Sequence, residues 1–250
     1  MTPTLPNGLR LFAFERLDST NAFARRLAEA GDAMPSVVWA LEQSAGAGRR
    51  GRAWHSPRGN LYVSLLLVPG RPLAAVAQLS FAAALAVGEA IEALAPPGRT
   101  VRFKWPNDVL LDGAKIAGIL LEAGDAAAAG ASPWLVVGVG INLDSHPPET
   151  PYPATHVAAA GGEPNIEKAL EVFVRAFLVR WERWLTEGFE PIRAEWLAKA
   201  FGRGTTIRVN LERDVLSGTF DGVDESGALV LGVPGGHRSI AAGEIFFGAG

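Results

Sequence analysis

The sequence predicts an α+β fold in which helices flank a mixed β-sheet and a small all-β unit follows. Four β-rich runs between residues 101 and 142 follow one another without a helix between each pair, which argues against a doubly wound parallel sheet. From residue 205 onward, short β-rich runs alternate with turn signals such as Asp221-Gly222. This shift in composition predicts two domains, residues 1–202 and residues 203–250.

The first hundred residues alternate between strand and helix signals. The β-rich runs are residues 9–14, 37–43 and 61–68. Asp18-Ser19-Thr20-Asn21 is a cluster of helix-capping residues, and apolar residues at helical spacing follow it as far as Gly31, which ends the predicted helix. Residues 73–95 are alanine-rich and apolar and end at Pro96-Pro97-Gly98. Polar residues interrupt this segment, so we expect a buried core helix rather than a membrane span.

The remaining elements follow from the same signals. Strands are predicted at residues 101–104, 109–111, 115–122 and 134–142, loops at 123–132 and 144–164, and helices at 166–186 and 191–200. The two helices carry an aromatic stripe made of Phe173, Phe177, Trp181, Trp184 and Trp196. Such a stripe at helical spacing predicts core packing rather than cofactor binding.

The most informative segment is Lys104-Trp105-Pro106-Asn107-Asp108, with Lys115 seven residues further on. Asp112-Gly113 predicts a two-residue hairpin turn, because such a turn requires positive φ. Leu110 then faces Lys115, and the period of two places Asp108, Leu110 and Lys115 on one face of the sheet. Asp108 and Lys115 become diagonal neighbours. A cation beside a carboxylate suits a site that handles a phosphate and its metal ion.

Composition excludes several classes of protein. The chain has no cysteine, which excludes disulfides, thiol nucleophiles and cysteine-ligated metals and fits a reducing cytoplasm. A net charge of −3 provides no global field that favours nucleic acid. The N-terminus lacks a basic start followed by an apolar run, so no signal peptide is expected. The four histidines lack metal-ligand spacing. We therefore expect a cytoplasmic globular protein.

Residues 46–54, Gly-Ala-Gly-Arg-Arg-Gly-Arg-Ala-Trp, form a glycine-rich cationic loop. The loop contains the G-x-G-x-x-G pattern of dinucleotide-binding proteins, but no helix follows it and no suitable acidic residue lies about 20 residues on. Its arginines can bond phosphate oxygens, and Trp54 offers a face for stacking a ring. Taken alone, the segment also fits a mobile surface loop or an RNA-contacting patch of Arg49, Arg50 and Arg52.

Three further motifs are ambiguous when each is taken alone. Ser19-Thr20-Asn21 fits a plain helix cap, or a set of donors at a helix start that holds a small polar group. Gln43 ends a strand beside the glycine-rich loop. The segment 138–142, Gly-Val-Gly-Ile-Asn, closes another strand, where its glycines permit close packing and Asn142 can bond a ribose or phosphate. No Ser-His-Asp or paired-carboxylate arrangement is identifiable.

In their order along the chain, these motifs resemble one family: the biotin–protein ligases, also called biotin–acetyl-CoA-carboxylase ligases or holocarboxylase synthetases. The matching segments are residues 19–21, 43, 46–54, 104–108, 115–122 and 138–143. The resemblance spans essentially the whole chain. It implies a class II synthetase-like catalytic domain and a C-terminal SH3-like β-barrel.

The resemblance also implies a two-step ligase reaction. The biotin carboxylate attacks the α-phosphate of ATP, which gives biotinyl-5′-AMP and pyrophosphate. A lysine amine of a biotin carboxyl carrier protein then attacks the acyl-adenylate, and AMP leaves. ATP, Mg²⁺ and biotin are therefore the expected small molecules, and the carrier protein is the expected partner. No membrane partner is expected, and a homodimer is a possible oligomeric state.

Roles for particular residues come from the same resemblance. The expected catalytic residues are Arg49, Lys104, Asp108 and Lys115, with Asp108 serving Mg²⁺ through the phosphates. The expected biotin contacts are Ser19, Thr20, Asn21, Gln43, Ala47, Gly48, Arg49, Lys115 and Gly118. The expected ATP contacts are Arg49, Arg52, Trp54, Lys104, Asn107, Lys115 and Asn142. Arg49, Arg52 and Trp54 are also expected to cover the intermediate.

Two features depart from the family pattern. Some members carry an N-terminal winged-helix DNA-binding domain, whereas the catalytic part begins here almost at Met1, so no repressor role is implied. The family loop often reads G-R-G-R-x-G-R, and Ala47 stands at its first arginine. Two alternatives stay open: a lipoate–protein ligase, related in fold and chemistry, and a non-catalytic nucleic-acid-binding protein that uses Arg49, Arg50 and Arg52.

Overall fold

A computed structural model describes residues 3–125, 133–211 and 214–247. Seven strands form one sheet in the order β1-β2-β3-β7-β6-β5-β4, and five strands form a second sheet in the order β11-β10-β9-β8-β12. In the larger sheet β1 and β2 pair in parallel, and the other pairs are antiparallel. The predicted α+β class with a mixed sheet is therefore confirmed.

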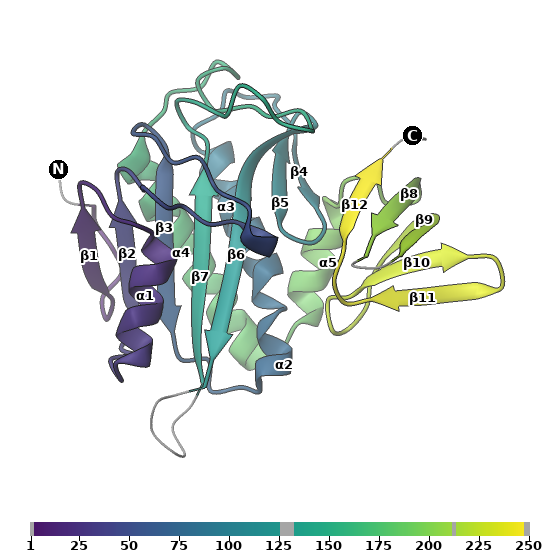
Figure 1. Ribbon diagram of the computed structural model, residues 1–250, viewed down its shortest axis with the longest axis horizontal. Coiled ribbons are helices and arrows are strands. Elements are labelled where there is room, and N and C mark those ends of the chain that lie inside the picture. Colours follow the sequence, from purple (N-terminus) through teal and green to yellow (C-terminus); the bar gives the residue numbers. More distant parts are fainter. Residues whose placement is uncertain (1–2, 126–132, 212–213, 248–250) are drawn as a thin grey trace.

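Figure 1 shows how the elements follow one another. The larger sheet contains β1 (Arg10–Phe14), β2 (Ser36–Ala40), β3 (Leu61–Leu67), β4 (Val101–Lys104), β5 (Asp108–Leu111), β6 (Ala114–Gly124) and β7 (Trp134–Ile141). The helices are α1 (Thr20–Glu29), α2 (Leu73–Val76), α3 (Leu79–Glu92), α4 (Ile166–Glu187) and α5 (Glu190–Ala198), and a 3₁₀ turn, η1, spans Arg49–Gly51. The smaller sheet contains β8 (Thr206–Asn210), β9 (Val215–Val223), β10 (Leu229–Val233), β11 (Gly236–Ile240) and β12 (Glu244–Phe247).

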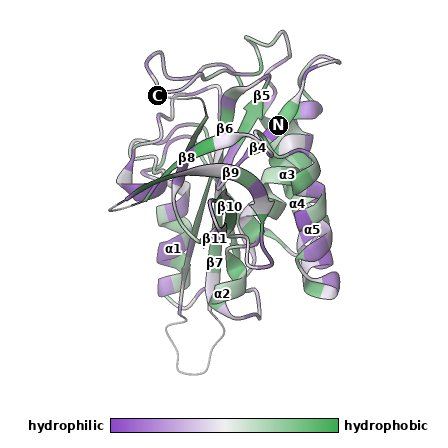
Figure 2. Cartoon of the chain, turned by 90° about the vertical axis from the view of Figure 1, so that its right-hand side faces the viewer, coloured by the Kyte–Doolittle hydropathy of each residue, from purple (hydrophilic) through white to green (hydrophobic). Residues whose placement is uncertain are grey.

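Helices cover both faces of the larger sheet (Figure 1). On one face, α3 and α4 pack over the strands and form most of the core. Phe173, Phe177, Trp184 and Trp196 of the aromatic stripe are buried there, as predicted. On the other face, α1 buries small residues of its inner side against β2, β3 and β7. Figure 2 shows hydrophilic segments along α1 and α5 at the two sides of the molecule.

The helix predicted over residues 73–95 is wrong as one continuous element, because it divides into α2 and α3. Gln78 lies at the break. Its Oε1 accepts a hydrogen bond from Trp184 Nε1 at 2.8 Å, and its Nε2 donates to the Glu225 carbonyl at 3.0 Å. These long-range partners tie the break to α4 and to the smaller sheet. The span 73–92 is apolar and long enough to cross a membrane by composition, but α3 is buried between the sheet and α4, as predicted for a core helix.

The β5–β6 hairpin forms as predicted, with one added irregularity. Asp112 and Gly113 have φ of 50° and 83°, and Leu110 pairs with Lys115. A β-bulge then shifts the register, so that Asp108 pairs with Gly118. No local sequence signal predicted this bulge. Asp108 and Lys115 stay close in the shifted register and form an ion pair of 2.6 Å.

The β-rich tail adjoins the β4–β5 end of the larger sheet (Figure 1). Trp105, almost fully buried, donates from Nε1 to the Gly227 carbonyl at 3.1 Å. The predicted β-rich character of the tail is confirmed by its antiparallel sheet. Closure of this sheet into an SH3-like barrel stays a prediction. We propose that the division into residues 1–202 and 203–250 separates the two units. Part of the predicted loop 123–132 lies outside the described residues.

The aromatic core makes a direct stability prediction. Phe177 is fully buried, whereas Val179, two residues along the same helix, is 64% exposed. Phe177→Ala should lower the free energy of unfolding by about 3–5 kcal/mol, because it leaves a cavity. Val179→Ala should stay within about 0.5 kcal/mol of the wild type. Urea unfolding followed by circular dichroism measures both, and equal losses would contradict the assigned core.

Candidate active site

The candidate site is a pocket between the glycine-rich loop and the face of the larger sheet on which α1 packs. Its lining comes from the start of α1, the loop, the β4–β5 turn, β6, β7 and the region of β12. The predicted site residues that line it are Ser19, Thr20, Asn21, Gln43, Ala47, Gly48, Arg49, Arg52, Trp54, Lys104, Asn107, Asp108, Lys115 and Gly118. The fold thus brings together segments that are more than 90 residues apart in the sequence.

Asn142 is not among the lining residues of this pocket. It is buried, its Nδ2 donates to the Thr155 carbonyl at 3.1 Å, and its backbone N–H donates to the Ile116 carbonyl at 2.8 Å. Thr155 in turn donates its backbone N–H to the Lys115 carbonyl. In this geometry Asn142 supports the segment beside Lys115, and its contact with a nucleotide stays a prediction.

Lys115 and Asp108 form the centre of the charged end of the pocket. Their 2.6 Å ion pair is largely buried, with side chains 14% and 16% exposed. The Lys115 Nζ also lies 5.4 Å from the ring centre of Trp54 and 5.1 Å from that of Tyr152. Aromatic faces at this distance attract a cation. The diagonal neighbours predicted from the hairpin therefore place a fixed positive charge in the pocket.

Lys104 adds a second cation in a drier setting. Its Nζ lies between 5.7 and 5.9 Å from the ring centres of Tyr152, Phe246 and Phe247. Burial lowers the pKa of the Lys104 amine, and the nearby carboxylate of Asp108 opposes part of this shift. A bound anion would favour the charged amine, because an opposite charge stabilises it.

Arg49 and Arg52 reach the pocket from the glycine-rich loop. Arg49 Nη1 donates to Asn107 Oδ1 at 3.4 Å, and burial lowers the pKa of its guanidinium. Arg52 Nη1 bonds Glu244 Oε1 at 2.8 Å, which raises the pKa of Arg52. Both arginines line the pocket, Arg49 partly buried and Arg52 with its side chain 51% exposed. The pairing of Arg52 with Glu244 cancels part of the surface charge that the nucleic-acid-binding alternative needs.

Trp54 sets the distance between the loop and the sheet. A Cβ atom on Gly118 would lie 3.0 Å from Trp54 Cζ3, and a Cβ atom on Gly140 would overlap the indole. Glycine at these positions of β6 and β7 therefore lets the ring approach the backbone closely. The indole Nε1 is buried against Gly140 and has no hydrogen-bond partner among the residues described.

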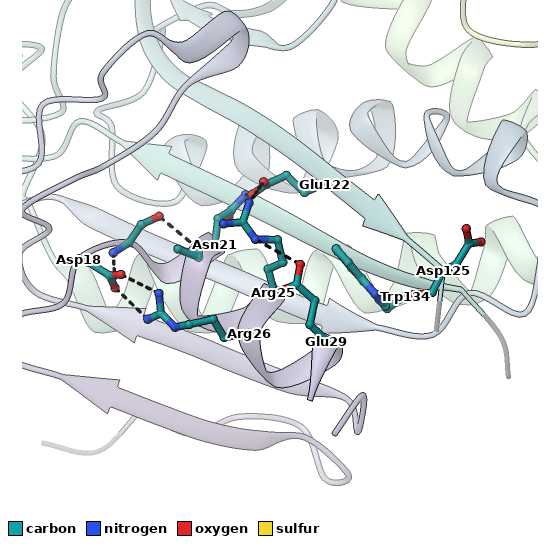
Figure 3. Close-up of polar contacts among 10 residues, drawn as sticks. Asp18, Asn21, Arg25, Arg26, Glu29, Glu122, Asp125 and Trp134 are labelled. Atoms are coloured by element: carbon teal, nitrogen blue, oxygen red, sulfur yellow. Dashed lines mark hydrogen bonds and ion pairs between the residues drawn. The ribbon is translucent and has the colours of Figure 1, made fainter. Parts of the chain in front are cut away.

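The other end of the pocket is polar and uncharged. Gln43 Oε1 accepts from the Thr20 backbone N–H at 2.8 Å, and Gln43 Nε2 donates to Ser56 Oγ at 3.0 Å. The Ser19 side chain caps α1 by accepting from Ala22 N, as the plain-cap interpretation requires. Asn21 Nδ2 donates to Glu122 Oε2 of β6 at 2.7 Å (Figure 3). Its contact with a ligand stays a prediction.

Tyr152 and Glu244 line the pocket, but the sequence analysis did not predict them as site residues. Tyr152 lies in the proline-rich segment Thr150-Pro151-Tyr152-Pro153, and a lone aromatic among prolines was the one local signal. Glu244 begins β12, far along the sequence from Lys104 and Lys115. Its place in the site depends on how the smaller sheet lies against the larger one, which no local pattern encodes.

The acidic residues of the pocket suit a metal ion that arrives with its ligand. Among the described residues, no cluster of three or more His, Cys, Asp or Glu side chains could hold a metal ion. Asp108 and Glu244 are the carboxylates in the lining. Mg²⁺ bound to phosphates needs just one or two protein carboxylates. The donor set therefore fits a metal–phosphate complex better than a resident ion.

Comparison with known families matches both parts of the chain. Residues 22–198 match the Biotin/lipoate A/B protein ligase family, and residues 202–248 match the Biotin protein ligase C terminal domain. Together the two matched segments cover most of the sequence.

Individual relatives are similar over nearly the whole chain. The biotin–[acetyl-CoA-carboxylase] ligase of Paracoccus denitrificans is 42% identical over 93% of this chain and 98% of that protein. The bifunctional ligase/repressor BirA of Bacillus subtilis is 35% identical over 96% of this chain and 75% of that protein. The structure of a biotin protein ligase from Aquifex aeolicus in complex with biotin and ATP is 27% identical, with a TM-score of 0.80 over 95% of this chain and 97% of that chain.

The burial of Lys104 predicts the pH at which its amine loses a proton. Because burial favours the neutral amine, its pKa should lie below the ordinary value of 10.5. The free energy of unfolding should then rise with pH between the lowered pKa and 10.5, because the unfolded chain binds more protons there. NMR titration of labelled lysines, with Lys104→Arg for assignment, measures the midpoint. Inorganic phosphate should raise it, and a midpoint at or above 10.5 without phosphate would contradict the burial argument.

Proposed function

The chain belongs to the biotin/lipoate A/B protein ligase family, and we propose that it is a biotin–protein ligase. It activates biotin with ATP to biotinyl-5′-AMP and then transfers biotin to a lysine of a biotin carboxyl carrier protein. The observation that carries this proposal is the division of one pocket into a cationic end and a polar, uncharged end. The cationic end suits the carboxylate and phosphates, and the polar end suits the ureido ring.

In the first step two anions must meet. A carboxylate oxygen of biotin attacks the α-phosphorus, and the bond from that phosphorus to the leaving pyrophosphate breaks. Lys115, held by Asp108, supplies fixed positive charge where the carboxylate and the α-phosphate approach. Lys104, Arg49 and Asn107 serve the phosphates. Mg²⁺ that arrives with ATP would add positive charge on the phosphate oxygens, with Asp108 as its protein carboxylate.

In the second step a neutral lysine amine of the carrier attacks the acyl carbon. The bond between that carbon and the AMP oxygen breaks, and the amine loses a proton. The acyl-adenylate must be kept from water until this amine arrives. The glycine-rich loop supports that role because Trp54 packs against β6 and β7, and Arg52 is bonded to Glu244. Catalysis then depends mainly on positioning and electrostatics.

Biotin is favoured over lipoate by the polar end of the pocket. Thr20 and Gln43 present oxygen atoms 3.1 Å apart in the lining. The ureido ring has N–H donors to satisfy such acceptors, whereas the dithiolane ring of lipoate has none. A site built to hydrogen-bond its substrate rejects an analogue that lacks those groups. The match of residues 202–248 to the Biotin protein ligase C terminal domain supports the same choice.

The partner and setting follow from the chemistry. The acceptor is the carrier protein of a biotin-dependent carboxylase, and the name of the Paracoccus denitrificans relative points to acetyl-CoA carboxylase. A cytoplasmic location and the possible homodimer stay predictions. Ala47, exposed in the loop, replaces the arginine that many relatives carry, and nothing in the structure explains this substitution.

Removing the amine of Lys115 tests the first step. Lys115→Ala should lower the rate of biotin-dependent pyrophosphate release by about 10²–10³, the scale for loss of one preorganised electrostatic group. Lys168→Ala, an exposed lysine near the start of α4, should leave the rate unchanged. Near wild-type pyrophosphate release by Lys115→Ala would rule out its assigned role.

Removing the side chain of Arg49 tests the covering loop. Arg49→Gly should release free biotinyl-AMP and label lysines of bystander proteins, because the loop no longer retains the intermediate. Arg58→Gly is the matched control, since Arg58 lies 55% exposed near the loop and bonds Glu15. Mass spectrometry of the released adenylate and of an added bystander protein measures both effects. Equal retention of the intermediate in both variants would count against the covering role of Arg49.

A further inference from the structure

A chain of hydrogen bonds leads from the polar end of the pocket to a carboxylate that does not line it. The chain runs from Thr20 through Ser64 and Asn21 to Glu122. The other carboxylate oxygen of Glu122 accepts from Arg25 Nη1 at 3.0 Å, near the outer side of α1 (Figure 3). Thr20, Asn21 and Ser64 are almost fully buried. The proposed chemistry gives Glu122 no role, so its link to the pocket needs an explanation.

The neighbours of Asn21 fix the direction of its amide. Its Nδ2 lies 2.7 Å from Glu122 Oε2 and 3.4 Å from the Leu120 carbonyl oxygen. Both of these oxygens can only accept hydrogen bonds. The reverse orientation would place the amide oxygen against a carboxylate. Asn21 Oδ1 therefore faces Ser64 Oγ, at 2.6 Å.

The direction of the next two hydrogen bonds follows from that amide. An amide oxygen can only accept, so Ser64 gives its hydroxyl hydrogen to Asn21. The Oγ atoms of Ser64 and Thr20 are 2.8 Å apart, a distance at which either hydroxyl can be the donor. Ser64 has no second hydrogen to give. The Thr20 hydroxyl has two acceptors, Gln43 Oε1 at 3.1 Å and Ser64 Oγ at 2.8 Å, and it donates to the nearer Ser64. The hydroxyl hydrogen of Thr20 is then no longer available to the pocket.

The consequence is a pair of acceptors at the polar end. Gln43 Oε1 is held in place because it accepts from the Thr20 backbone N–H while Gln43 Nε2 donates to Ser56. Thr20 Oγ1 and Gln43 Oε1 lie 3.1 Å apart, and both present lone pairs. Two neighbouring acceptors need donors from a ligand, because buried polar groups are costly when they are unpaired.

We propose that Glu122 is a positioning residue that, through Asn21 and Ser64, keeps the Thr20 hydroxyl hydrogen away from Gln43, so that Thr20 Oγ1 and Gln43 Oε1 both accept hydrogen bonds from the substrate. The inference rests on the proposed function, in which the ureido N–H groups of biotin are the donors. Gly138 of β7 makes room for the relay, since a Cβ atom there would overlap Asn21 Oδ1. Glu122 would thereby contribute to the choice of acid without touching it.

Glu122→Gln tests the relay with an isosteric change. The guanidinium of Arg25 can only donate, so the new amide turns its oxygen to Arg25 and its NH₂ group to Asn21. The Asn21 amide must then reverse, Ser64 becomes its acceptor, and Ser64 donates to Thr20. Thr20 then donates to Gln43 Oε1, 3.1 Å away, and the pair of acceptors that faces the ligand is lost. Calorimetric titration should show the Kd for biotin raised by about 10- to 100-fold, with the Kd for ATP within about twofold of wild type.

Two further variants make the test specific. Glu29→Gln removes the same charge from the other carboxylate that faces Arg25, with Nε and Oε1 3.7 Å apart, and should leave the Kd for biotin within about twofold. Ser64→Ala interrupts the relay, so Glu122→Gln added to it should change the Kd by less than about twofold. A single Glu122→Gln variant that binds biotin like the wild type would overturn the proposal. Full additivity of the two substitutions would also overturn it.

A readout without biotin separates this inference from the proposed function. The side-chain amide protons of Asn21 should shift in the ¹⁵N NMR spectrum of the free protein on Glu122→Gln and stay in place on Glu29→Gln. If the wild type binds no biotin, the proposed function fails, while the shift still supports the relay. If the wild type binds biotin and Glu122→Gln changes neither the spectrum nor the Kd, the relay fails alone.

Discussion

The close approach of Trp54 to the sheet is the contact on which the site depends. The indole can reach β6 and β7 because Gly118 and Gly140 carry no side chain. That contact brings the glycine-rich loop over the hairpin, so that Arg49 and Arg52 share one pocket with Lys115. Charges from distant parts of the chain are thereby concentrated on one small volume, where they act more strongly than in water.

Several cations buried together repel one another unless carboxylates lie beside them. Lys115 and Arg52 have such a partner in this pocket, and Lys104 lies among aromatic rings. Asp108 pairs with Lys115 and Glu244 pairs with Arg52, whereas Lys104 is left among aromatic rings with a lowered pKa. The pocket thus contains incompletely neutralised positive charge, which suits anionic reactants. At the opposite end, hydrogen bonds among neutral groups set donors and acceptors rather than charge. The cationic end therefore suits the reaction of the anions, and the neutral end suits recognition of the substrate.

Local sequence signals predicted the elements well and the assembled site in part. The Asp112-Gly113 turn and the alternation of a strand were enough to bring Asp108 to Lys115, because both rules act over a few residues. The bulge in β5–β6 and the break at Gln78 were missed. At the break, Gln78 bonds Trp184 and Glu225, which lie more than 100 residues away in the sequence. Glu244 and Tyr152 could not be found because their place depends on packing between distant segments. The roles of individual residues came from the family resemblance rather than from geometry.

We propose that this one pocket activates biotin as an acyl-adenylate. The most direct test is mass spectrometry of the acid-quenched small-molecule products of the purified protein with Mg-ATP, with biotin and lipoate offered separately. We expect biotinyl-AMP with biotin and no adenylate with lipoate. Lipoyl-AMP as the main product would contradict the choice of acid, and no adenylate with either acid would contradict the claim itself.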